Sequence, residues 1–438
     1  MNYYSTNGKA PIADLRKAVV KGLEEDRGLY MPERIKKLPK AFFDDMADMK
    51  FQDIAYNVAS AFFGEDVDLD SLKDLVYDTL QFDCPVVKVK DHIYTLELFH
   101  GPTLAFKDVG ARFMARLLQY FIRGEQSGAD GGKTVNVLVA TSGDTGSAVA
   151  NGFLGVEGIH VYVLYPKGKV SPIQECQFTT LGRNITAVEV DGVFDDCQAL
   201  VKSAFMDAEL NAHMKLTSAN SINVARFLPQ AFYYFNAYAR MKALGLADEL
   251  VMCVPSGNFG NICAALFGHE MGLPVKRFIA ANNANDVFYN YLQTGKYEPK
   301  PSVQTLANAM DVGDPSNFAR IYDLYGKNHE RISSLISGAT YSDEQIRQTM
   351  RQCYEETGYI LDPHGACGYQ ALADGLQPGE VGVFCETAHP AKFKEKVDDI
   401  LGIDMEIPER LAAFMRGEKQ SVPMTKDFSD FKAYLLKQ

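Results

Sequence analysis

The segment Val135-Asn-Val-Leu-Val-Ala140 runs into the loop Thr141-Ser-Gly-Asp-Thr-Gly146 and then into a helical pattern, Ser147–Phe153. A short apolar run rich in valine predicts a buried strand. The polar loop with two glycines predicts a turn between that strand and the helix. A strand followed by a loop and a helix is the repeating unit of parallel sheets covered by helices.

The same unit recurs along most of the chain and predicts an α/β fold class. Short apolar runs, each followed by a polar loop and a helical pattern, are Val135–Ala140, Val161–Tyr165, Ala187–Val190, Val251–Val254, Phe278–Ala281 and Val381–Cys385. Parallel sheets buried on both faces have strands of this kind. With 438 residues, the chain is long enough for two such sheets.

The first 90 residues have a different pattern. Apolar residues recur at helical spacing at Ile12, Leu15, Val19 and Leu23, and again along Phe51–Phe62. We therefore expect three domains: a mostly helical N-terminal domain in 1–90, a smaller α/β domain in 91–230 with a substrate-binding loop, and a larger α/β domain in 231–438. The larger domain is expected to be completed by segments from 86–110. An irregular excursion is expected at Tyr291–Pro301.

Composition narrows the class of protein. The net charge of −12 argues against nucleic acids and anionic membranes as partners. No apolar run spans a bilayer and no export leader opens the chain, so we expect a cytoplasmic protein. The eight cysteines contain no C-x-x-C pair and the histidines show no ligand spacing, which predicts reduced thiols and no metal. The stretch Ser127–Thr134 resembles a P-loop, but it precedes a strand instead of following one.

One lysine lies in an otherwise apolar, small-residue segment. It is Lys107 in Glu97-Leu-Phe-His-Gly-Pro-Thr-Leu-Ala-Phe-Lys-Asp108, and a long helical pattern follows it. Burial lowers the pKa of a lysine and makes its free amine a nucleophile, as in a Schiff-base lysine that holds pyridoxal 5'-phosphate (PLP). The alternative is a lysine that extends into solvent from the start of a helix.

Loops at the carboxyl ends of strands are where an open α/β sheet binds ligands. The loop Pro255-Ser-Gly-Asn-Phe-Gly-Asn261 opens a helix, and its backbone N–H groups suit a phosphate ester. The alternative is a tight turn without a ligand. The loop Pro255–Asn261 lacks the G-x-G-x-x-G spacing of a dinucleotide site, which weakens the interpretation of the protein as a dehydrogenase. Thr141–Gly146 suits a carboxylate or a second phosphate, unless Ser142 or Asp144 only caps its helix.

Three further polar clusters are candidates. Arg226, behind Ser218-Ala-Asn-Ser221, can bind a phosphate or be a solvated helix residue. Thr387 follows the last strand and can face a pyridine nitrogen without protonating it. His389 and Lys392 are either part of this cluster or surface residues, and Asp362-Pro-His364-Gly365 is either a turn or carries a substrate-side histidine.

The order of these motifs resembles fold type II PLP enzymes, and within them the threonine synthase family. The matching stretches are Leu96–Asp108, Ala140–Gly146, Ala309-Met-Asp-Val-Gly-Asp-Pro-Ser-Asn-Phe318 and Thr387-Ala-His-Pro-Ala-Lys-Phe393. Tyr4-Ser-Thr-Asn-Gly and Gly28-Leu-Tyr-Met-Pro-Glu33 resemble that family's extra N-terminal domain. The resemblance covers nearly the whole chain. Many fold type II enzymes have Asn where this chain has Asp144. The longer threonine synthases resemble this chain in having Asp, so the role of Asp144 is open.

The resemblance implies a role for each matching residue. Lys107 would be the catalytic residue and carry PLP as a Schiff base, and Thr387 would meet its pyridine nitrogen. Ser142 and Thr145 would bind the substrate carboxylate, and Ser221 and Arg226 the substrate phosphate. The cofactor phosphate would be held by Gly257, Asn258, Phe259, Gly260 and Asn261.

The implied reaction is that of a lyase in threonine biosynthesis. O-phospho-L-homoserine and water would give L-threonine and phosphate, by elimination of phosphate from Cγ and addition of water at Cβ. We expect a monomer or a homodimer. Alternatives are a serine or threonine dehydratase on the same fold, which needs no site for a substrate phosphate, and a non-catalytic ligand-binding protein.

Overall fold

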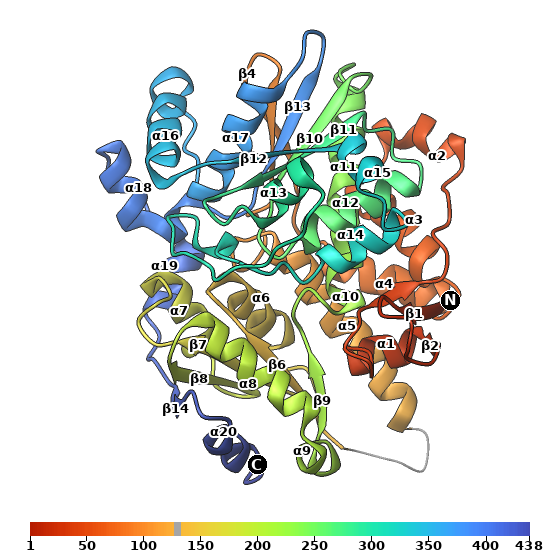
Figure 1. Cartoon of the computed structure of the whole chain (residues 1–438), viewed down its shortest axis with the longest axis vertical. Coiled ribbons are helices and arrows are strands. Elements are labelled where there is room, and N and C mark those ends of the chain that lie inside the picture. The colour runs from red at the N-terminus through yellow and green to blue at the C-terminus, as the bar shows by residue number, and fades with distance from the viewer. Residues whose placement is uncertain (127–132) are drawn as a thin grey trace. The chain divides into compact units, whose positions relative to one another are not determined.

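The computed structural model describes residues 1–126 and 133–438 (Figure 1). The chain divides into two compact units, each built from segments that are distant in the sequence. Unit 1 contains Met1, Met31–Phe106 and Phe227–Glu406, and unit 2 contains Asn2–Tyr30, Lys107–Arg226 and Ile407–Gln438. The division into domains at residues 90 and 230 stays a prediction.

Unit 1 is built on a six-stranded sheet with the order β12-β11-β10-β13-β5-β4. The strands are parallel except for the edge pair β4 and β5, which is antiparallel. Their bounds are β4 Val86–Lys90, β5 Ile93–Glu97, β10 Leu250–Pro255, β11 Arg277–Asn282, β12 Ile336–Thr340 and β13 Val381–Glu386. Every residue of β10 and β13 is buried, so both strands read as continuous apolar runs.

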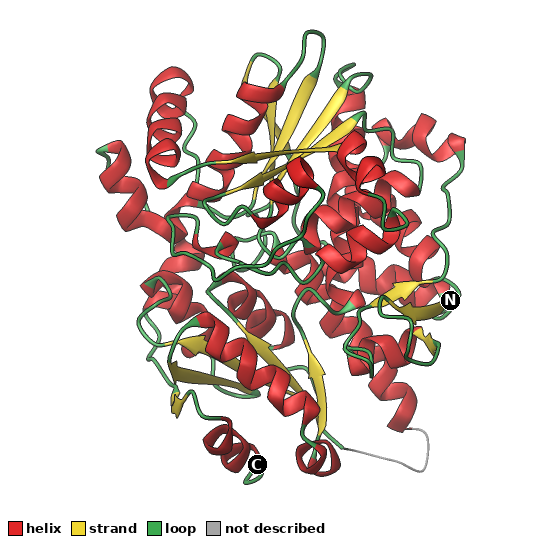
Figure 2. Cartoon of the chain, viewed as in Figure 1, coloured by secondary structure: helices red, strands yellow, loops and turns green. Residues whose placement is uncertain are grey.

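Helices cover the sheet of unit 1 (Figure 2). Its helix α17, Pro363–Gly375, packs against β10, β11 and β13. The other helices are α2 Lys40–Asp45, α3 Phe51–Phe63, α4 Leu69–Thr79, α11 Ala231–Ala243, α12 Gly260–Glu270, α13 Val287–Thr294, α14 Phe318–Leu324, α15 His329–Leu335, α16 Asp343–Thr357 and α18 Lys394–Leu401. Four 3₁₀ turns complete the unit: η1 Met46–Asp48, η2 Leu228–Gln230, η3 Asn308–Met310 and η4 Pro390–Phe393.

Unit 2 is built on a five-stranded sheet, all parallel, with the order β14-β8-β7-β6-β9. The strand bounds are β6 Val135–Ala140, β7 Ile159–Pro166, β8 Ile185–Asp191, β9 Lys215–Ser218 and β14 Val422–Thr425. The helices are α1 Leu15–Lys21, α5 Lys107–Gln126, α6 Asp144–Phe153, α7 Pro172–Thr179, α8 Phe194–Met206, α9 Ala208–His213, α10 Val224–Phe227, α19 Glu409–Met415 and α20 Phe428–Leu435. Two short strands, β1 Asn2–Ser5 and β2 Ala13–Asp14, pair near the N-terminus, and β3 Tyr30–Pro32 follows.

The predicted α/β fold class is confirmed, with two sheets built mainly of parallel strands and an N-terminal part that is mostly helical. All six predicted strands are present, as β6, β7, β8, β10, β11 and β13. Two details were wrong. Ile12 lies outside α1 and is 61% exposed. The irregular segment expected at Tyr291–Pro301 begins inside α13, which ends only at Thr294, where Gly295 adopts a left-handed conformation.

Two further sequence expectations concern membranes and the P-loop-like stretch. Within residues 1–126 and 133–438, no helix is both long and apolar enough to cross a membrane. Of the P-loop-like stretch Ser127–Thr134, residues 127–132 lie outside the described residues.

Candidate active site

Lys107 is the first residue of α5 and its side chain is half-buried. Its ammonium Nζ donates a hydrogen bond to the hydroxyl Oγ1 of Thr145, at 2.7 Å, within unit 2. The preceding residue, Phe106, donates its backbone N–H to the carbonyl of Thr387 at 2.8 Å, within unit 1. The alternative of a lysine directed into solvent is therefore wrong. Its amine is held beside a hydroxyl of the loop that follows β6.

The loop between β6 and α6 is organised by Thr141. Its hydroxyl accepts hydrogen bonds from the backbone N–H groups of Gly143, at 2.9 Å, and Gly146, at 2.8 Å. Gly143 is the N-cap of α6 with φ of 148°, a conformation that favours glycine, and the side chain that binds an N–H of the first helical turn is that of Thr141. The alternative of Ser142 or Asp144 as a helix cap is therefore wrong, and the hydroxyls of Ser142 and Thr145 lie in half-buried residues.

Asp144 is buried and accepts a hydrogen bond from the side-chain amide of Gln174, at 3.0 Å. Gln174 comes from α7 and is itself fully buried. A Cβ added to Gly143 would lie 2.6 Å from this amide, so only glycine lets the two groups approach. Gln174 carried no signal in the sequence, because a single amide inside an amphipathic helix has no distinguishing spacing.

Arg226 is 1% exposed, so the alternative of a solvated helix arginine is wrong. Its guanidinium donates to the carbonyl of Ala219, and a Cβ on Gly110 of α5 would overlap the Arg226 carbonyl. The nearby Asn223 donates to the carbonyls of Ser218, at 3.0 Å, and Val19, at 2.9 Å, which fixes the loop that also carries the half-buried Ser221. Ser221 and Arg226 thus lie on one short, rigid segment of unit 2.

The predicted glycine loop joins β10 to the N-terminus of α12. Phe259 is the N-cap with φ of 65° and makes no side-chain cap bond. The N–H of Ile262 donates to the side-chain oxygen of Asn261 at 2.9 Å, which leaves the backbone N–H groups of Gly260 and Asn261 at the helix start for an anion. A Cβ on Gly257 would lie 2.7 Å from the Ala309 carbonyl, so the loop needs glycine at this close approach. This cradle of backbone N–H groups fits the phosphate group of PLP.

Two asparagines shape the glycine loop from within. The side chain of Asn261 donates to the Pro255 carbonyl at 2.8 Å and accepts from the Ser256 hydroxyl at 3.1 Å. Asn258 accepts the backbone N–H of Ser316 on its side-chain oxygen at 2.7 Å. The structure therefore uses both side chains to hold the loop.

The segment before α14 supports the glycine loop and was not predicted to do so. Asp311 accepts hydrogen bonds from the Thr305 hydroxyl, at 2.7 Å, and the Asn283 amide, at 2.9 Å. Burial raises the pKa of Asp311 to about 6, although the hydrogen bonds from Thr305 oppose the shift. The sequence did contain a signal for this segment: the stretch Ala309–Phe318 resembles the threonine synthase family. That resemblance did not indicate what the segment does in the structure.

The end of β13 carries Thr387, which is buried. The surface interpretation of Lys392 is wrong, since this lysine is fully buried and donates to the Thr103 carbonyl at 2.9 Å. His389 is half-buried and accepts the Ala391 N–H at 3.0 Å. Burial, and then the charge of His100, lower the pKa of His389 to about 4, so its ring is neutral at pH 7.

Asp362 and His364 do not form an isolated turn, as one interpretation expected. Asp362 caps α17 by accepting the Gly365 N–H at 2.7 Å, and its other oxygen binds Nδ1 of His364 at 2.5 Å. The Nε2 atom of His364 accepts the Ala309 N–H at 3.1 Å. Both ring nitrogens are therefore engaged inside unit 1, which argues against a substrate-side histidine.

These features define a class of protein, the PLP-dependent enzymes. The family profile described as "Pyridoxal-phosphate dependent enzyme" matches residues 81–386. Residues 2–80 match the profile "Threonine synthase N terminus", and residues 365–435 match "Threonine synthase, C-terminal". The chain belongs to the threonine synthase family.

Comparisons with individual proteins agree. The chain is 44% identical over 437 residues to threonine synthase of Haemophilus influenzae, with 100% of both chains covered. The crystal structure of threonine synthase from Escherichia coli is 42% identical and superposes with a TM-score of 0.93 over 100% of each chain. A PLP-bound threonine synthase from Brucella melitensis is 32% identical, with a TM-score of 0.89 over 100% of this chain and 99% of that one. The chain is thus a PLP-dependent lyase of this family, and its cofactor is PLP.

Proposed function

We propose that the enzyme converts O-phospho-L-homoserine and water into L-threonine and inorganic phosphate. The observation that carries this proposal is the full-length similarity to threonine synthases, which includes the N-terminal and C-terminal regions outside the shared PLP-enzyme fold. A dehydratase would share the fold without needing a site for a substrate phosphate. The buried Arg226 beside Ser221 supports the presence of such a site.

Lys107 is proposed as the catalytic residue, which links to the cofactor and moves protons. PLP, when bound, withdraws electrons from the Cα of an amino-acid substrate. The amine of Lys107 then accepts the Cα proton and returns protons later, as phosphate leaves Cγ and water adds at Cβ. Its position is supported by the 2.7 Å hydrogen bond to Thr145 and by the backbone bond between Phe106 and Thr387.

The remaining roles are those that the family resemblance implies. The cofactor phosphate would be bound at the start of α12 by the backbone at Gly257, Asn258, Phe259, Gly260 and Asn261. Thr387 would meet the pyridine nitrogen, and Ser142 and Thr145 the substrate carboxylate. Ser221 and Arg226 would bind the substrate phosphate, for which a guanidinium supplies paired donors.

A turnover assay tests the proposal. Purified wild type with PLP is expected to release phosphate and form L-threonine in equal amounts from O-phospho-L-homoserine. Lys107→Ala is expected to lower kcat by at least about a thousandfold, because the proton carrier is lost. Lys40→Ala, at the exposed first residue of α2, is the matched control and retains activity. Phosphate release without threonine, or an active Lys107→Ala, would contradict the proposal.

Arg226→Lys tests the substrate-phosphate site separately. Replacing paired donors by a point charge is expected to raise KM for O-phospho-L-homoserine by about tenfold while PLP still binds. An unchanged KM in a folded variant would assign Arg226 to structure alone and would favour the dehydratase alternative, with L-serine and L-threonine as the substrates to assay.

Location and assembly are also proposals. A cytoplasmic enzyme is supported by the eight cysteines, all within the described residues, because none of them forms a disulfide. A monomer or a homodimer is proposed, which sedimentation of the holoenzyme distinguishes from larger assemblies.

A further inference from the structure

The last residue of β13, Glu386, carries a carboxyl group in an unusual place. Its side chain is 0% exposed, and the next residue in the chain is Thr387. One carboxyl oxygen, Oε1, accepts the backbone N–H of Asp362 at 2.8 Å. The other, Oε2, receives no hydrogen bond from any described residue. A buried, ionised carboxylate would need donors at both oxygens.

Asp362, whose backbone N–H binds Oε1 of Glu386, is also fully buried. Its two oxygens already receive hydrogen bonds, from Gly365 N–H at 2.7 Å and from His364 Nδ1 at 2.5 Å. Two buried carboxyl groups in contact do not both ionise, and the charge goes to the one with more donors. Asp362 therefore carries the charge, and Glu386 keeps the proton and donates it toward Asp362.

The pKa directions agree with this geometry. Burial raises the pKa of Glu386 well above its usual range, and the charge and hydrogen bond of Asp362 raise it further. Burial also raises the pKa of Asp362, but the His364 ring and the hydrogen bonds from Glu386, His364 and Gly365 outweigh it, so the pKa of Asp362 is lowered.

The chain of hydrogen bonds continues to the glycine loop. His364 accepts the Ala309 N–H at 3.1 Å, and the carbonyl of Ala309 lies against Gly257. A Cβ on Gly365 would lie 2.0 Å from Oε2 of Glu386, so glycine is required where α17 approaches the carboxyl group. A continuous path thus links the strand end before Thr387 to the proposed phosphate loop, all within unit 1.

We propose that Glu386, Asp362 and His364 form a buried proton-holding chain, in which the neutral Glu386 carboxyl donates to Asp362, and that this chain positions both Thr387 and the Gly257 loop for the cofactor. The three residues are positioning residues and do not touch the substrate. The proposal rests on the proposed cofactor contacts of Thr387 and the Gly257 loop.

Other titratable groups pack around Glu386 and enter any pH experiment. Glu97 lies opposite Glu386 on β5, and the hydroxyl of Tyr359 donates to Glu97 at 2.6 Å. Asp362, Glu97 and Tyr359 interact electrostatically with Glu386 itself. The groups that act on these residues in turn are His364, His100 and His389, with Lys392 acting on His389. These groups are present in wild type and in a Glu386 variant alike. Their contributions to the pH dependence of stability therefore largely cancel when the two proteins are compared.

Thermal unfolding of the apoprotein against pH is the first test. Since the folded-state pKa of Glu386 is raised, its stabilising contribution is complete below about pH 4 and is lost as pH rises through the folded pKa. Glu386→Gln keeps a neutral donor at every pH. The melting temperature of Glu386→Gln minus that of wild type is therefore expected to increase steadily as pH rises from about 4 to about 9.

Glu97→Gln is the matched control for this titration, because Glu97 is the cross-strand partner of Glu386. Burial opposes ionisation of Glu97, but its hydrogen bonds to His100 and Tyr359 prevail and lower its pKa. The stability that ionised Glu97 contributes is present above about pH 4 and lost as pH falls, so Glu97→Gln is expected to fall behind wild type as pH rises. A Glu386→Gln difference that does not grow with pH would overturn the proposal.

PLP affinity, read from the cofactor's absorption on titration, tests the positioning role. Glu386→Leu removes both the donor to Asp362 and the acceptor for its N–H, and is expected to bind PLP about tenfold more weakly. Glu386→Gln is expected to restore most of that loss. Equal affinity in wild type and Glu386→Leu would overturn the positioning role. If wild type itself did not bind PLP, the proposed function would fail, whereas the pH result on apoprotein would stand.

Discussion

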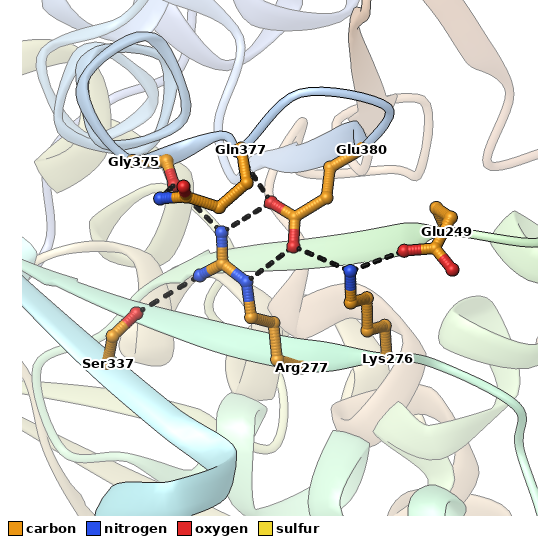
Figure 3. Close-up of polar contacts among 7 residues, drawn as sticks. All are labelled: Glu249, Lys276, Arg277, Ser337, Gly375, Gln377 and Glu380. Carbon is orange, nitrogen blue, oxygen red and sulfur yellow. Dashed lines mark hydrogen bonds and ion pairs between the residues drawn. The ribbon is translucent and has the colours of Figure 1, made fainter.

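Two carboxyl groups at the opposite ends of β13 show opposite behaviour. Glu380 precedes the strand and Glu386 ends it, and both are buried. Glu380 accepts hydrogen bonds from Arg277 Nε at 3.0 Å, Arg277 Nη2 at 2.6 Å and the Gln377 N–H at 2.8 Å (Figure 3). Hydrogen bonds from Arg277 lower the pKa of Glu380 to about 2, against the effect of burial. Among the described residues, no donor reaches the second carboxyl oxygen of Glu386, and burial followed by the charge of Asp362 raises its pKa.

The difference shows that partners, more than burial, set the charge of a buried carboxyl. The starting edge of the sheet is the side at which the parallel strands begin. There the charges of Arg277 and Glu380 are paired, and this ion pair links the start of β11 to the start of β13. At the carboxyl edge, where α/β sheets bind ligands, one carboxyl is neutral and relays hydrogen bonds to loops. The starting edge therefore supports stability, and the carboxyl edge supports function.

Glu380→Ala is the change that should disturb the starting edge most. It leaves the guanidinium of Arg277 without its carboxylate partner in a largely buried position, at a cost of about 3–5 kcal/mol in the free energy of unfolding. Urea unfolding followed by circular dichroism measures this loss. PLP affinity of the folded variant is expected to stay at the wild-type value, and a loss of PLP binding without a loss of stability would contradict the assignment.

The pH dependence of stability tests whether Glu380, unlike Glu386, is ionised in the folded protein. Because the folded pKa of Glu380 is lowered to about 2, its stabilising contribution is present above about pH 4 and is lost as pH falls through about 2. Wild type should exceed Glu380→Gln in stability at pH 7 by up to about 3 kcal/mol, and the gap should close on acidification. Unfolding midpoints across this pH range report the gap, and a constant gap would show that Glu380 is not ionised in the folded protein.

Gly365→Ala tests the carboxyl edge by overpacking. The new methyl group would overlap the Glu386 carboxyl, which is expected to cost about 1–3 kcal/mol and to weaken PLP binding as well. Gly375→Ala on the same helix is the control, because its nearest neighbour is an Ile279 methyl at 3.3 Å. Calorimetry with a PLP titration compares the two variants. Equal behaviour would show that the close approach at Gly365 has no role.

Glu249→Gln should have the smallest effect. Glu249 pairs with Lys276 at the outer part of the same ion cluster, but both side chains are largely exposed (Figure 3). Exposed ion pairs contribute below about 1 kcal/mol. A larger loss in urea unfolding would mean that the whole cluster, not the buried pair alone, stabilises the starting edge.

The sequence predicted the interior of each sheet and missed its edges. All six predicted strands, such as β10 and β13, have neighbours on both sides and are mostly apolar. The edge strands β4, β9, β12 and β14 were not singled out, and neither was β5. Edge strands are half exposed and include residues such as Lys88 and Pro423, so they lack a continuous apolar run.

The residues of the candidate site also fall into two groups, those that a local sequence motif marks and those that no local motif marks. Loops that directly follow strands, such as those with Thr141 and Gly257, were found because a turn motif marks each one. Residues that act through contacts between distant segments were not found, including Gln174 and Asp311. Glu386 stood in a quoted motif, but its neutral state depends on Asp362, which lies 24 residues away in the sequence. No local pattern encodes that contact.

The most direct measurement is the infrared spectrum of protonated carboxyl groups at neutral pH, compared between wild type, Glu386→Gln and Glu380→Gln. Glu24, whose pKa burial raises to about 7, contributes equally in all three proteins and cancels in the differences. The protonated carboxyl band of Glu386 is expected in wild type and in Glu380→Gln and is expected to be missing from Glu386→Gln. Identical bands in wild type and Glu386→Gln would contradict it, because Glu386 would then be ionised like Glu380.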